Sequence, residues 1–496
     1  MPRSTRFPRA LPLLAAALAL GASALASCGD DDDDASDASA GAGGAGNVGV
    51  CPDGSGEALL AALRALPGVQ AEPAETPVEG ACAFELRLEQ PVDHQAPAGA
   101  RFQQRARLLH RGPNAPVSLA STGYALSSRR ANDTELSYLL RGNLLFVEHR
   151  YFPPSAPEPR DWAFLNIEQA AADHHRFVET LKPLYPGVWV SEGASKGGMT
   201  SVYHRRFYPG DVAGTVAYVA PQSQGPLDTR YGEFLEQVGD AACRDRIIAL
   251  QREALTPPRR QALVAKMVAA AAPAGQTFDF FGPDKLFEFA IGELRFLFWQ
   301  YQDPARCDEL PAAAATASDD ELYEFLDSVS SFASFYDDAS LEFFSPYYYQ
   351  SATQLGGPGP IEQHLDGLLL YPGENVVGAY PPAGVAKAFD PTPMTDIDAW
   401  LGTEAERILF VYGEYDPWTA GAFAPSGARE TLRLTVPRGN HGSQLLDLPA
   451  AEREQAFRAL STWTGVTPQA PPAPASALAA SFRRTRLPPR GAPLAP

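Results

Sequence analysis

Short runs of apolar residues alternate with longer amphipathic segments through most of the chain. The runs occupy residues 116–120, 143–147, 188–190, 215–219, 408–412 and 431–436. Each is rich in Val, Leu, Ile or Phe, which is typical of strands buried on both faces of a parallel sheet. Helical patterns between the runs favour an α/β fold, with a doubly wound and mostly parallel sheet.

The interval between the fourth and fifth runs has a different pattern. From about residue 225 to residue 390, apolar residues recur mostly at helical spacing, as in LFEFAIGELRFLFW at 286–299. We expect a large helical cap inserted over the carboxyl edge of the sheet, where α/β proteins bind ligands. The core then has two parts, 50–224 and 391–466.

The N-terminal segment has the form of an export signal. Three arginines precede the apolar stretch 11–22, which is too short to span a bilayer stably. The sequence LASC at 25–28 resembles a bacterial lipobox, which predicts removal of residues 1–27 and a lipid on Cys28. Ordinary secretion with cleavage near Ala26 is the alternative; both predict an exported protein.

Two further segments have compositions that cannot form a packed core. Residues 28–49 are acidic and rich in Gly and Ala, as in a flexible tether, and residues 467–496 form a Pro/Ala/Arg-rich tail expected to be disordered. The tether matches G-x-G-x-x-G at Gly41, Gly43 and Gly46. No strand precedes this match, so we attribute it to composition.

Charge and cysteine content exclude several classes of function. A net charge of −19 and a pI near 4.9 exclude a nucleic-acid binder, which needs a basic face. The chain lacks zinc-site spacings such as C-x-x-C or H-E-x-x-H, so we expect neither a metal nor a cofactor. In an oxidising compartment Cys51, Cys82, Cys243 and Cys307 allow three pairings, of which proximity favours Cys51–Cys82 and Cys243–Cys307.

A G-x-S-x-G motif follows the third apolar run. Gly193-Ala194-Ser195-Lys196-Gly197 lies between that run and a segment with helical character. A serine at a strand–turn–helix junction is the setting of a nucleophile elbow. The sequence therefore predicts Ser195 as a nucleophile, with Glu192 packing beneath the turn.

A carboxylate and an imidazole follow the two late strands. Asp416 lies in GEYDPW just after the fifth run, and His441 lies in PRGNHGS after the sixth. Asp416 could instead only cap its turn. His149, at the end of the second run, is the rival base, but it precedes the serine. The order Ser195, Asp416, His441 is that of the α/β-hydrolase fold.

The proposed roles follow from proton chemistry. His441 would remove the proton of Ser195 as its hydroxyl attacks a carbonyl, and Asp416 would hold the imidazole in the required tautomer. The oxyanion needs donors, for which we nominate the backbone amides of Lys196 and of Gly123 and Tyr124.

Several sequence blocks resemble the secreted bacterial prolyl tri/tetrapeptidyl aminopeptidases, and more distantly lysosomal Pro-X carboxypeptidase and dipeptidyl peptidase II. The blocks are EQPVDH at 89–94, STGY at 121–124, EHRYF at 148–152, GASKGGMT at 193–200, FWQY at 298–301 and GNHG at 439–442. The resemblance implies a serine exopeptidase that releases short peptides from free N-termini, with proline preferred on the acyl side. Its partner would be a peptide with a free N-terminus.

A proline site favours flat aromatic walls, and a substrate ammonium group needs a carboxylate. We therefore expect substrate contacts from Trp299, Tyr348, Trp418 and Glu293. Two other functions stay open at this point. One is an esterase or lipase with the same triad, and the other is a non-catalytic envelope lipoprotein. The lipobox and tether, absent from the secreted relatives, favour a membrane-anchored envelope protein.

Overall fold

The computed structural model describes residues 51, 54–126, 130–311, 313–427, 429–471 and 482. The expectations for the signal segment, the lipid on Cys28 and the tether lie outside these residues.

The described residues form one nine-stranded sheet. Its strands are β1 (Val69–Ala74), β2 (Cys82–Pro91), β3 (Arg101–His110), β4 (Val117–Ser121), β5 (Asn143–Val147), β6 (Trp189–Ala194), β7 (Thr215–Tyr218), β8 (Ile408–Gly413) and β9 (Leu432–Val436). They are ordered β1-β2-β3-β5-β4-β6-β7-β8-β9. The six predicted runs form the parallel strands β4 to β9. The strands β1 to β3 pair antiparallel and extend the sheet at the β5 side.

Helices cover both faces of the sheet, as in a doubly wound α/β protein. One face carries α1 (Gly56–Arg64), α3 (Ile167–Leu181), α4 (Lys196–Phe207) and α13 (Thr392–Thr403); the other carries α2 (Glu135–Leu139) and α14 (Ala450–Thr464). Successive residues of β8 show why both faces are apolar. Phe410 packs in the cluster that contains α4 and α13, while Leu409 and Val411 pack with α2 and α14.

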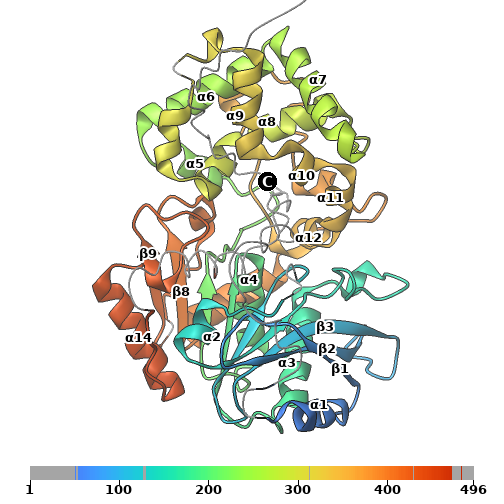
Figure 1. Ribbon diagram of the computed structural model, residues 1–496. Helices are drawn as coiled ribbons and strands as arrows, with labels where there is room; N and C mark the ends of the chain where they lie inside the picture. The colour runs from blue at the N-terminus through green and yellow to red at the C-terminus, as the bar shows by residue number, and fades with distance from the viewer. Residues whose placement is uncertain are drawn as a thin grey trace, which may run out of the picture. The chain divides into compact units, whose positions relative to one another are not determined.

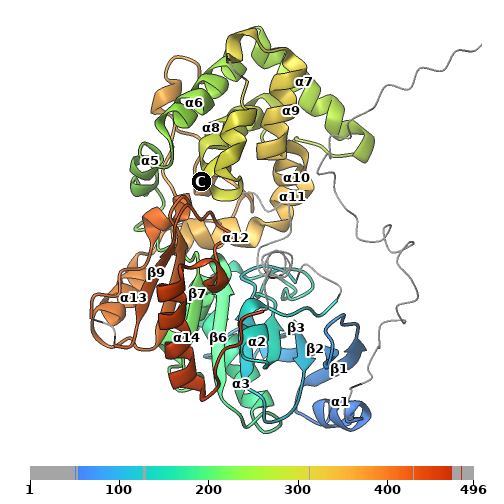
Figure 2. The same cartoon turned by 60° about the vertical axis from the view of Figure 1, so that its left-hand side comes forward.

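The segment between β7 and α13 is built mainly from helices. These are α5 (Arg230–Leu235), α6 (Ala241–Leu255), α7 (Arg259–Ala271), α8 (Pro283–Tyr301), α9 (Asp319–Ser330), α10 (Phe332–Tyr336), α11 (Asp338–Phe343) and α12 (Ser345–Gln350). Figures 1 and 2 show them gathered beyond one edge of the sheet, with α12 close to it. Their apolar faces form one large core cluster, which also includes Tyr124 and Phe152 from the sheet domain.

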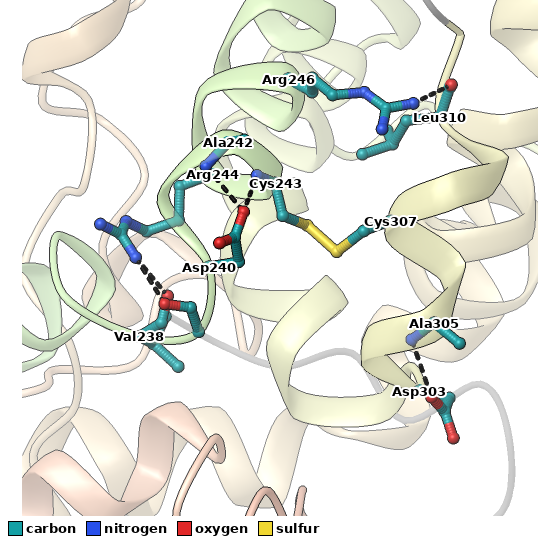
Figure 3. The surroundings of a disulfide bond; sticks show 11 residues. Val238, Asp240, Ala242, Cys243, Arg244, Arg246, Asp303, Ala305, Cys307 and Leu310 are labelled. Atoms are coloured by element: carbon teal, nitrogen blue, oxygen red, sulfur yellow. Dashed lines mark hydrogen bonds between the residues drawn. A yellow bond between two sulfur atoms is a disulfide. The ribbon is translucent and has the colours of Figure 1, made fainter.

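Two disulfides cross-link the described chain, and they join the pairs that proximity along the sequence favoured. Cys51 is bonded to Cys82 at the start of β2, and Cys243 in α6 is bonded to Cys307 in the turn after α8. Figure 3 shows that the second bond lies beside the start of α6, where Asp240 accepts hydrogen bonds from the amides of Ala242 and Cys243. Disulfides are typical of proteins that function outside the reducing cytoplasm.

The EQPVDH and EHRYF blocks meet at a buried ion pair. Arg150, fully buried, donates to both carboxylate oxygens of Asp173 in α3 at 2.7 and 2.8 Å, and to the carbonyl oxygen of Val92 at 3.0 Å. His94 lies 2.7 Å from the same carboxylate. Although burial opposes it, Arg150 lowers the pKa of Asp173 to about 2. These blocks therefore join β2, the end of β5 and α3, which is a structural role.

Within the described residues, no helix has the length and apolar character needed to cross a bilayer. The described part of the tail contacts the core. The amide of Gln469 donates to the carbonyl oxygen of Leu139, and Phe482 is 1 % exposed with its ring 5.3 Å from that of Tyr138. The rest of the predicted tail lies outside the described residues.

Candidate active site

Ser195 occupies the junction between β6 and α4. Its backbone has φ 54° and ψ −128°, a positive φ that is sterically unfavourable for a residue with a Cβ atom. A serine held in this conformation between a strand and a helix presents its hydroxyl at the carboxyl edge of the sheet. The local fold thus matches the nucleophile elbow that the sequence predicts.

Close backbone contacts explain the two glycines of the motif. A Cβ atom on Gly193 would lie 2.2 Å from the carbonyl oxygen of Gly197, and one on Gly197 would lie 2.2 Å from that of Ser121. Both distances are far below van der Waals contact. Glycine at these positions lets α4 begin directly after β6 and lets the elbow approach the end of β4. Glu192 is fully buried and accepts from Ser118 and Thr134.

The structure brings Asp416 and His441 together. Nδ1 of His441 donates to a carboxylate oxygen of Asp416 at 2.7 Å, and both side chains are buried. The other carboxylate oxygen accepts from the amide of Trp418 at 3.1 Å, at the start of the turn after β8. Asp416 therefore caps its turn and also holds the imidazole, so the two roles considered for it coexist.

The loop that carries His441 is docked on the carboxyl end of the cap helix α8. The amide of His441 donates to the carbonyl oxygen of Gln300 at 2.9 Å. The side-chain amide of Asn440 donates to the carbonyl oxygens of Tyr301 at 3.3 Å and Gln302 at 3.4 Å. The last carbonyls of a helix have no partner within the helix, and here the histidine loop supplies donors to them.

The contacts of His149 hold the local fold. It is buried, and its Nδ1 lies 2.9 Å from the carbonyl oxygen of Arg150. Burial, together with the nearby Lys196, lowers its pKa well below the ordinary value, so the ring stays neutral. Its backbone amide donates to the carbonyl oxygen of Tyr124 at 2.9 Å. The residue thus supports the loop after β4.

That loop places the phenol of Tyr124, and not its amide, against the nucleophile. The amide of Tyr124 donates to Oγ1 of Thr122 at 3.0 Å, and its role as an oxyanion donor stays a prediction. The hydroxyl of Tyr124 lies near the side chain of Ser195. Burial raises the pKa of this phenol well above 10, so it remains a protonated donor.

The side chain of Lys196 holds the same loop. Its buried ammonium group donates to the carbonyl oxygen of Gly123 at 2.7 Å and lies 5.7 Å from the ring centres of both Tyr124 and Phe152. Among the described residues, no carboxylate forms an ion pair with it. Burial lowers its pKa well below the ordinary value. The backbone amide of Lys196 lies at the start of α4, where amides lack helical acceptors.

Two aromatic rings, one from the cap and one from the turn after β8, lie near the imidazole of His441. The rings of Tyr301 and Trp418 lie 6.1 and 6.4 Å from that of His441. Trp299 lies elsewhere in this cluster, with its ring 5.6 Å from that of Tyr415 and packed closely against Gly239.

A second row of rings leads from Tyr124 into the cap. The centroid distances are 5.7 Å from Tyr124 to Tyr347, 5.8 Å from Tyr347 to Tyr348, and 4.6 Å from Tyr348 to Tyr380. The last two rings are stacked. The row ends at Glu293, which accepts from the hydroxyl of Tyr380 at 3.3 Å.

Glu293 lies in the middle of α8 as a buried carboxylate held by neutral donors. Besides Tyr380, it accepts from the hydroxyl of Tyr336 and from the side-chain amide of Asn375 at 2.9 Å. Among the described residues, no Lys, Arg or His forms an ion pair with it. Burial raises its pKa to about 7.

Sequence reasoning missed three tyrosines of this region, Tyr301, Tyr336 and Tyr380, as well as the phenol of Tyr124. The FWQY block contains Tyr301, which was a usable signal. The other contacts depend on tertiary packing. In the part of the chain that the structure describes, no group of three or more His, Cys, Asp or Glu side chains is placed to hold a metal ion.

The chain is similar to several known proteins. The prolyl tri/tetrapeptidyl aminopeptidase of Streptomyces mobaraensis is 42% identical over 401 residues, covering 80% of this chain and 83% of that protein. The lysosomal Pro-X carboxypeptidase of Mus musculus is 30% identical over 191 residues, covering 35% of this chain and 39% of that protein. The solved structure of the peroxisomal alpha-beta-hydrolase Lpx1 of Saccharomyces cerevisiae aligns with a TM-score of 0.36 at 10% identity, covering 82% of this chain and 97% of Lpx1.

The family model described as PS-10 peptidase S37 matches residues 58–490, which include the whole sheet, the cap, Ser195, Asp416 and His441. The chain therefore belongs to the PS-10 peptidase S37 family and is a peptidase.

Proposed function

We propose that this peptidase is a serine exopeptidase that releases tri- or tetrapeptides from free N-termini and prefers proline on the acyl side. The observation that carries the proposal is the 2.7 Å contact between His441 and Asp416, formed at the same sheet edge as the strained Ser195. The 42% identity to a prolyl tri/tetrapeptidyl aminopeptidase supports the choice of substrate.

The first half of the reaction forms an acyl-enzyme. Nε2 of His441 accepts the proton of Ser195 while Oγ bonds to the scissile carbonyl carbon. Asp416 keeps the Nδ1 proton in place and stabilises the imidazolium that results. His441 then gives its proton to the leaving amine as the C–N bond breaks.

The negative charge that develops on the carbonyl oxygen needs donors aimed at it. The backbone amides of Lys196 and Gly123 are two such donors in this proposal. The phenol of Tyr124 supplies another, because its hydroxyl already lies against Ser195. The second half of the reaction repeats these steps with water as the nucleophile, which frees the released peptide and restores Ser195.

The aromatic groups near His441 suit a proline ring on the acyl side. Trp418 packs edge-on against Tyr231 and Phe296 at 5.3 and 5.1 Å, so its indole is held rigidly. Its ring nitrogen is buried and has no hydrogen-bond partner among the described residues. A flat apolar ring fits such walls because it buries apolar surface with little loss of conformational entropy.

The test is digestion of proline-containing peptides of several lengths, each with a free or an acetylated N-terminus, followed by mass spectrometry of the products. We expect intact tri- or tetrapeptides from free N-termini only, and no products from Ser195→Ala. Cleavage at internal sites, equal use of acetylated peptides, or hydrolysis of short acyl esters alone would contradict the proposal.

We also propose that the enzyme is anchored to the cell envelope by a lipid on Cys28, which lies outside the described residues. The support is the lipobox-like LASC sequence together with the disulfides, which are typical of exported proteins. Partition into detergent of the full chain, and its loss in Cys28→Ala, tests the anchor. Release of the unmodified chain into the medium would contradict it.

A further inference from the structure

The surroundings of Glu293 have the composition of an ammonium-binding site. Its carboxylate accepts hydrogen bonds from three neutral groups, which belong to Tyr336, Asn375 and Tyr380. A buried carboxylate held only by neutral donors is costly to ionise without a cation. The arrangement therefore lacks one component, a positively charged group.

Aromatic faces complete this arrangement. The ring of Tyr348 stacks on that of Tyr380 at 4.6 Å, and its hydroxyl is buried without a hydrogen-bond partner among the described residues. Cations are attracted to aromatic faces, and carboxylates next to such faces bind ammonium groups. We call Glu293, Tyr336, Tyr348, Asn375 and Tyr380 the Glu293 cage.

The cage is connected to the catalytic residues in two ways. Through the buried core of the cap, the row Tyr124, Tyr347, Tyr348 leads from the surroundings of Ser195 to the cage by successive ring contacts. Along the backbone, Glu293 and Gln300 belong to the same helix α8, and the carbonyl oxygen of Gln300 holds the amide of His441.

Helix α8 therefore fixes the distance between the backbones of Glu293 and Gln300. Glu293 and Gln300 are seven positions apart, which is about 10 Å along a helix at roughly 1.5 Å per residue. An extended peptide advances about 3.3 Å per residue, so three residues also span about 10 Å. One rigid element thus spaces the backbone of Glu293 from the carbonyl group that holds the His441 amide by about the length of a tripeptide.

We propose that the Glu293 cage binds the α-ammonium group of the substrate and that α8 sets the number of residues between that group and Ser195. This inference rests on the proposed function, because it assumes a substrate with a free N-terminus. It adds the residues that recognise the terminus and the physical basis of the release length.

The experiment compares kcat/KM for a free and an N-acetylated tripeptidyl substrate in the wild type and in Glu293→Gln. The substitution removes the charge but keeps the shape and most hydrogen bonds. We expect the free substrate to lose about 10- to 100-fold in kcat/KM, mainly through KM, because a charge-assisted hydrogen bond is lost. The acetylated substrate should be unaffected, so the preference for free termini collapses and peptides of other lengths appear among the products.

Glu288→Gln is the matched control. Glu288 is also a buried carboxylate of α8, but it is paired with Arg260 at 2.6 Å. This variant should keep the preference for free termini even if its stability falls. Tyr348→Phe provides a second test that does not perturb a protein hydrogen bond, and it should lower kcat/KM several-fold for the free substrate only.

The outcomes separate the two proposals. If the wild type shows no preference for free termini, the proposed function fails and this inference fails with it. If the wild type shows the preference and a folded Glu293→Gln keeps it with an unchanged release length, the cage is not the ammonium site while the exopeptidase stands. Loss of the preference in Glu293→Gln and its retention in Glu288→Gln support the inference.

Discussion

His441 donates from Nδ1 to Asp416 at 2.7 Å, across 25 residues of sequence, while its backbone amide is held by Gln300 of the cap helix. His441 is therefore held by two elements, the turn that follows β8 and the helix α8. Because α8 belongs to the insertion, the cap contributes directly to the position of His441. Figure 1 shows how α8 runs through the centre of the helical layer.

Removing the charge of Asp416 tests this relationship. In Asp416→Asn the amide would favour the wrong imidazole tautomer, so we expect kcat to fall by about 10⁴-fold with little change in KM. Steady-state kinetics on a free tripeptidyl substrate measures this effect. Asp211→Asn is the control, because Asp211 forms a hydrogen bond to His204 at 2.9 Å outside the site. A mutant Asp416→Asn with kcat near that of the wild type would show that Asp416 only caps its turn.

Tyr124→Phe tests the phenol as a donor to the oxyanion. The ring would keep its contacts with Phe152 and Phe344, so the change is confined to the hydroxyl group. We expect kcat to fall by about 10²- to 10³-fold, the usual effect of removing an oxyanion donor. Tyr185→Phe, which removes the buried hydroxyl that contacts His110 at 3.0 Å, should leave kcat unchanged. Unchanged kcat in Tyr124→Phe would assign the phenol a packing role.

The raised pKa of Glu293 predicts a pH dependence of substrate selection. Burial raises that pKa to about 7, so the carboxyl group is neutral below pH 7 and charged above it. An α-ammonium group loses its proton above about pH 8. The ratio of kcat/KM for free and acetylated substrates should therefore be highest between about pH 7 and 8 and fall toward acidic pH. Because the catalytic groups titrate equally with both substrates, their titration does not affect this ratio. The same decline of the ratio at acidic pH in Glu293→Gln would contradict the assignment of Glu293 as the ammonium-binding group.

The disulfide between Cys243 and Cys307 should stabilise the cap. It closes a segment with a sequence separation of 64 residues, for which the chain-entropy model gives about 4 kcal/mol of unfolding free energy. Replacement of both cysteines by serine should lower the melting temperature measured by circular dichroism. Cys51→Ser with Cys82→Ser, which opens a shorter separation of 31 residues, should cost slightly less. An unchanged melting temperature in the cap variant would show that packing around α6 suffices.

The parallel half of the sheet could be predicted because its strands are buried on both faces. Runs such as NLLFV and ILFVY have no exposed face and therefore no alternation, which makes them distinct from the helices around them. The strands β2 and β3 gave no such signal. They carry charged residues such as Glu85 and Arg105 that pair across the sheet, so their sequences look polar until the partner strand is known.

The contact between Asp416 and His441 could be predicted because each residue follows a recognisable strand, and the carboxyl ends of parallel strands meet at one edge. Which group of Tyr124 faces Ser195 could not be predicted. Whether its amide or its phenol meets Ser195 depends on the hydroxyl of Thr122, the backbone of His149 and the ammonium group of Lys196. These contacts join segments far apart in the sequence. The same holds for the Glu293 cage, whose members come from four separate parts of the insertion.

The central claim is that a serine held at a strand–helix turn, and activated by an imidazole from the far end of the chain, performs the cleavage. Reaction with a fluorophosphonate, followed by peptide mapping, measures this directly. The account predicts one phosphonylated residue, Ser195, with peptidase activity lost in proportion to labelling and no label in Ser195→Ala. A modified enzyme that still cleaves peptides, or equal labelling of Ser195→Ala, would contradict it.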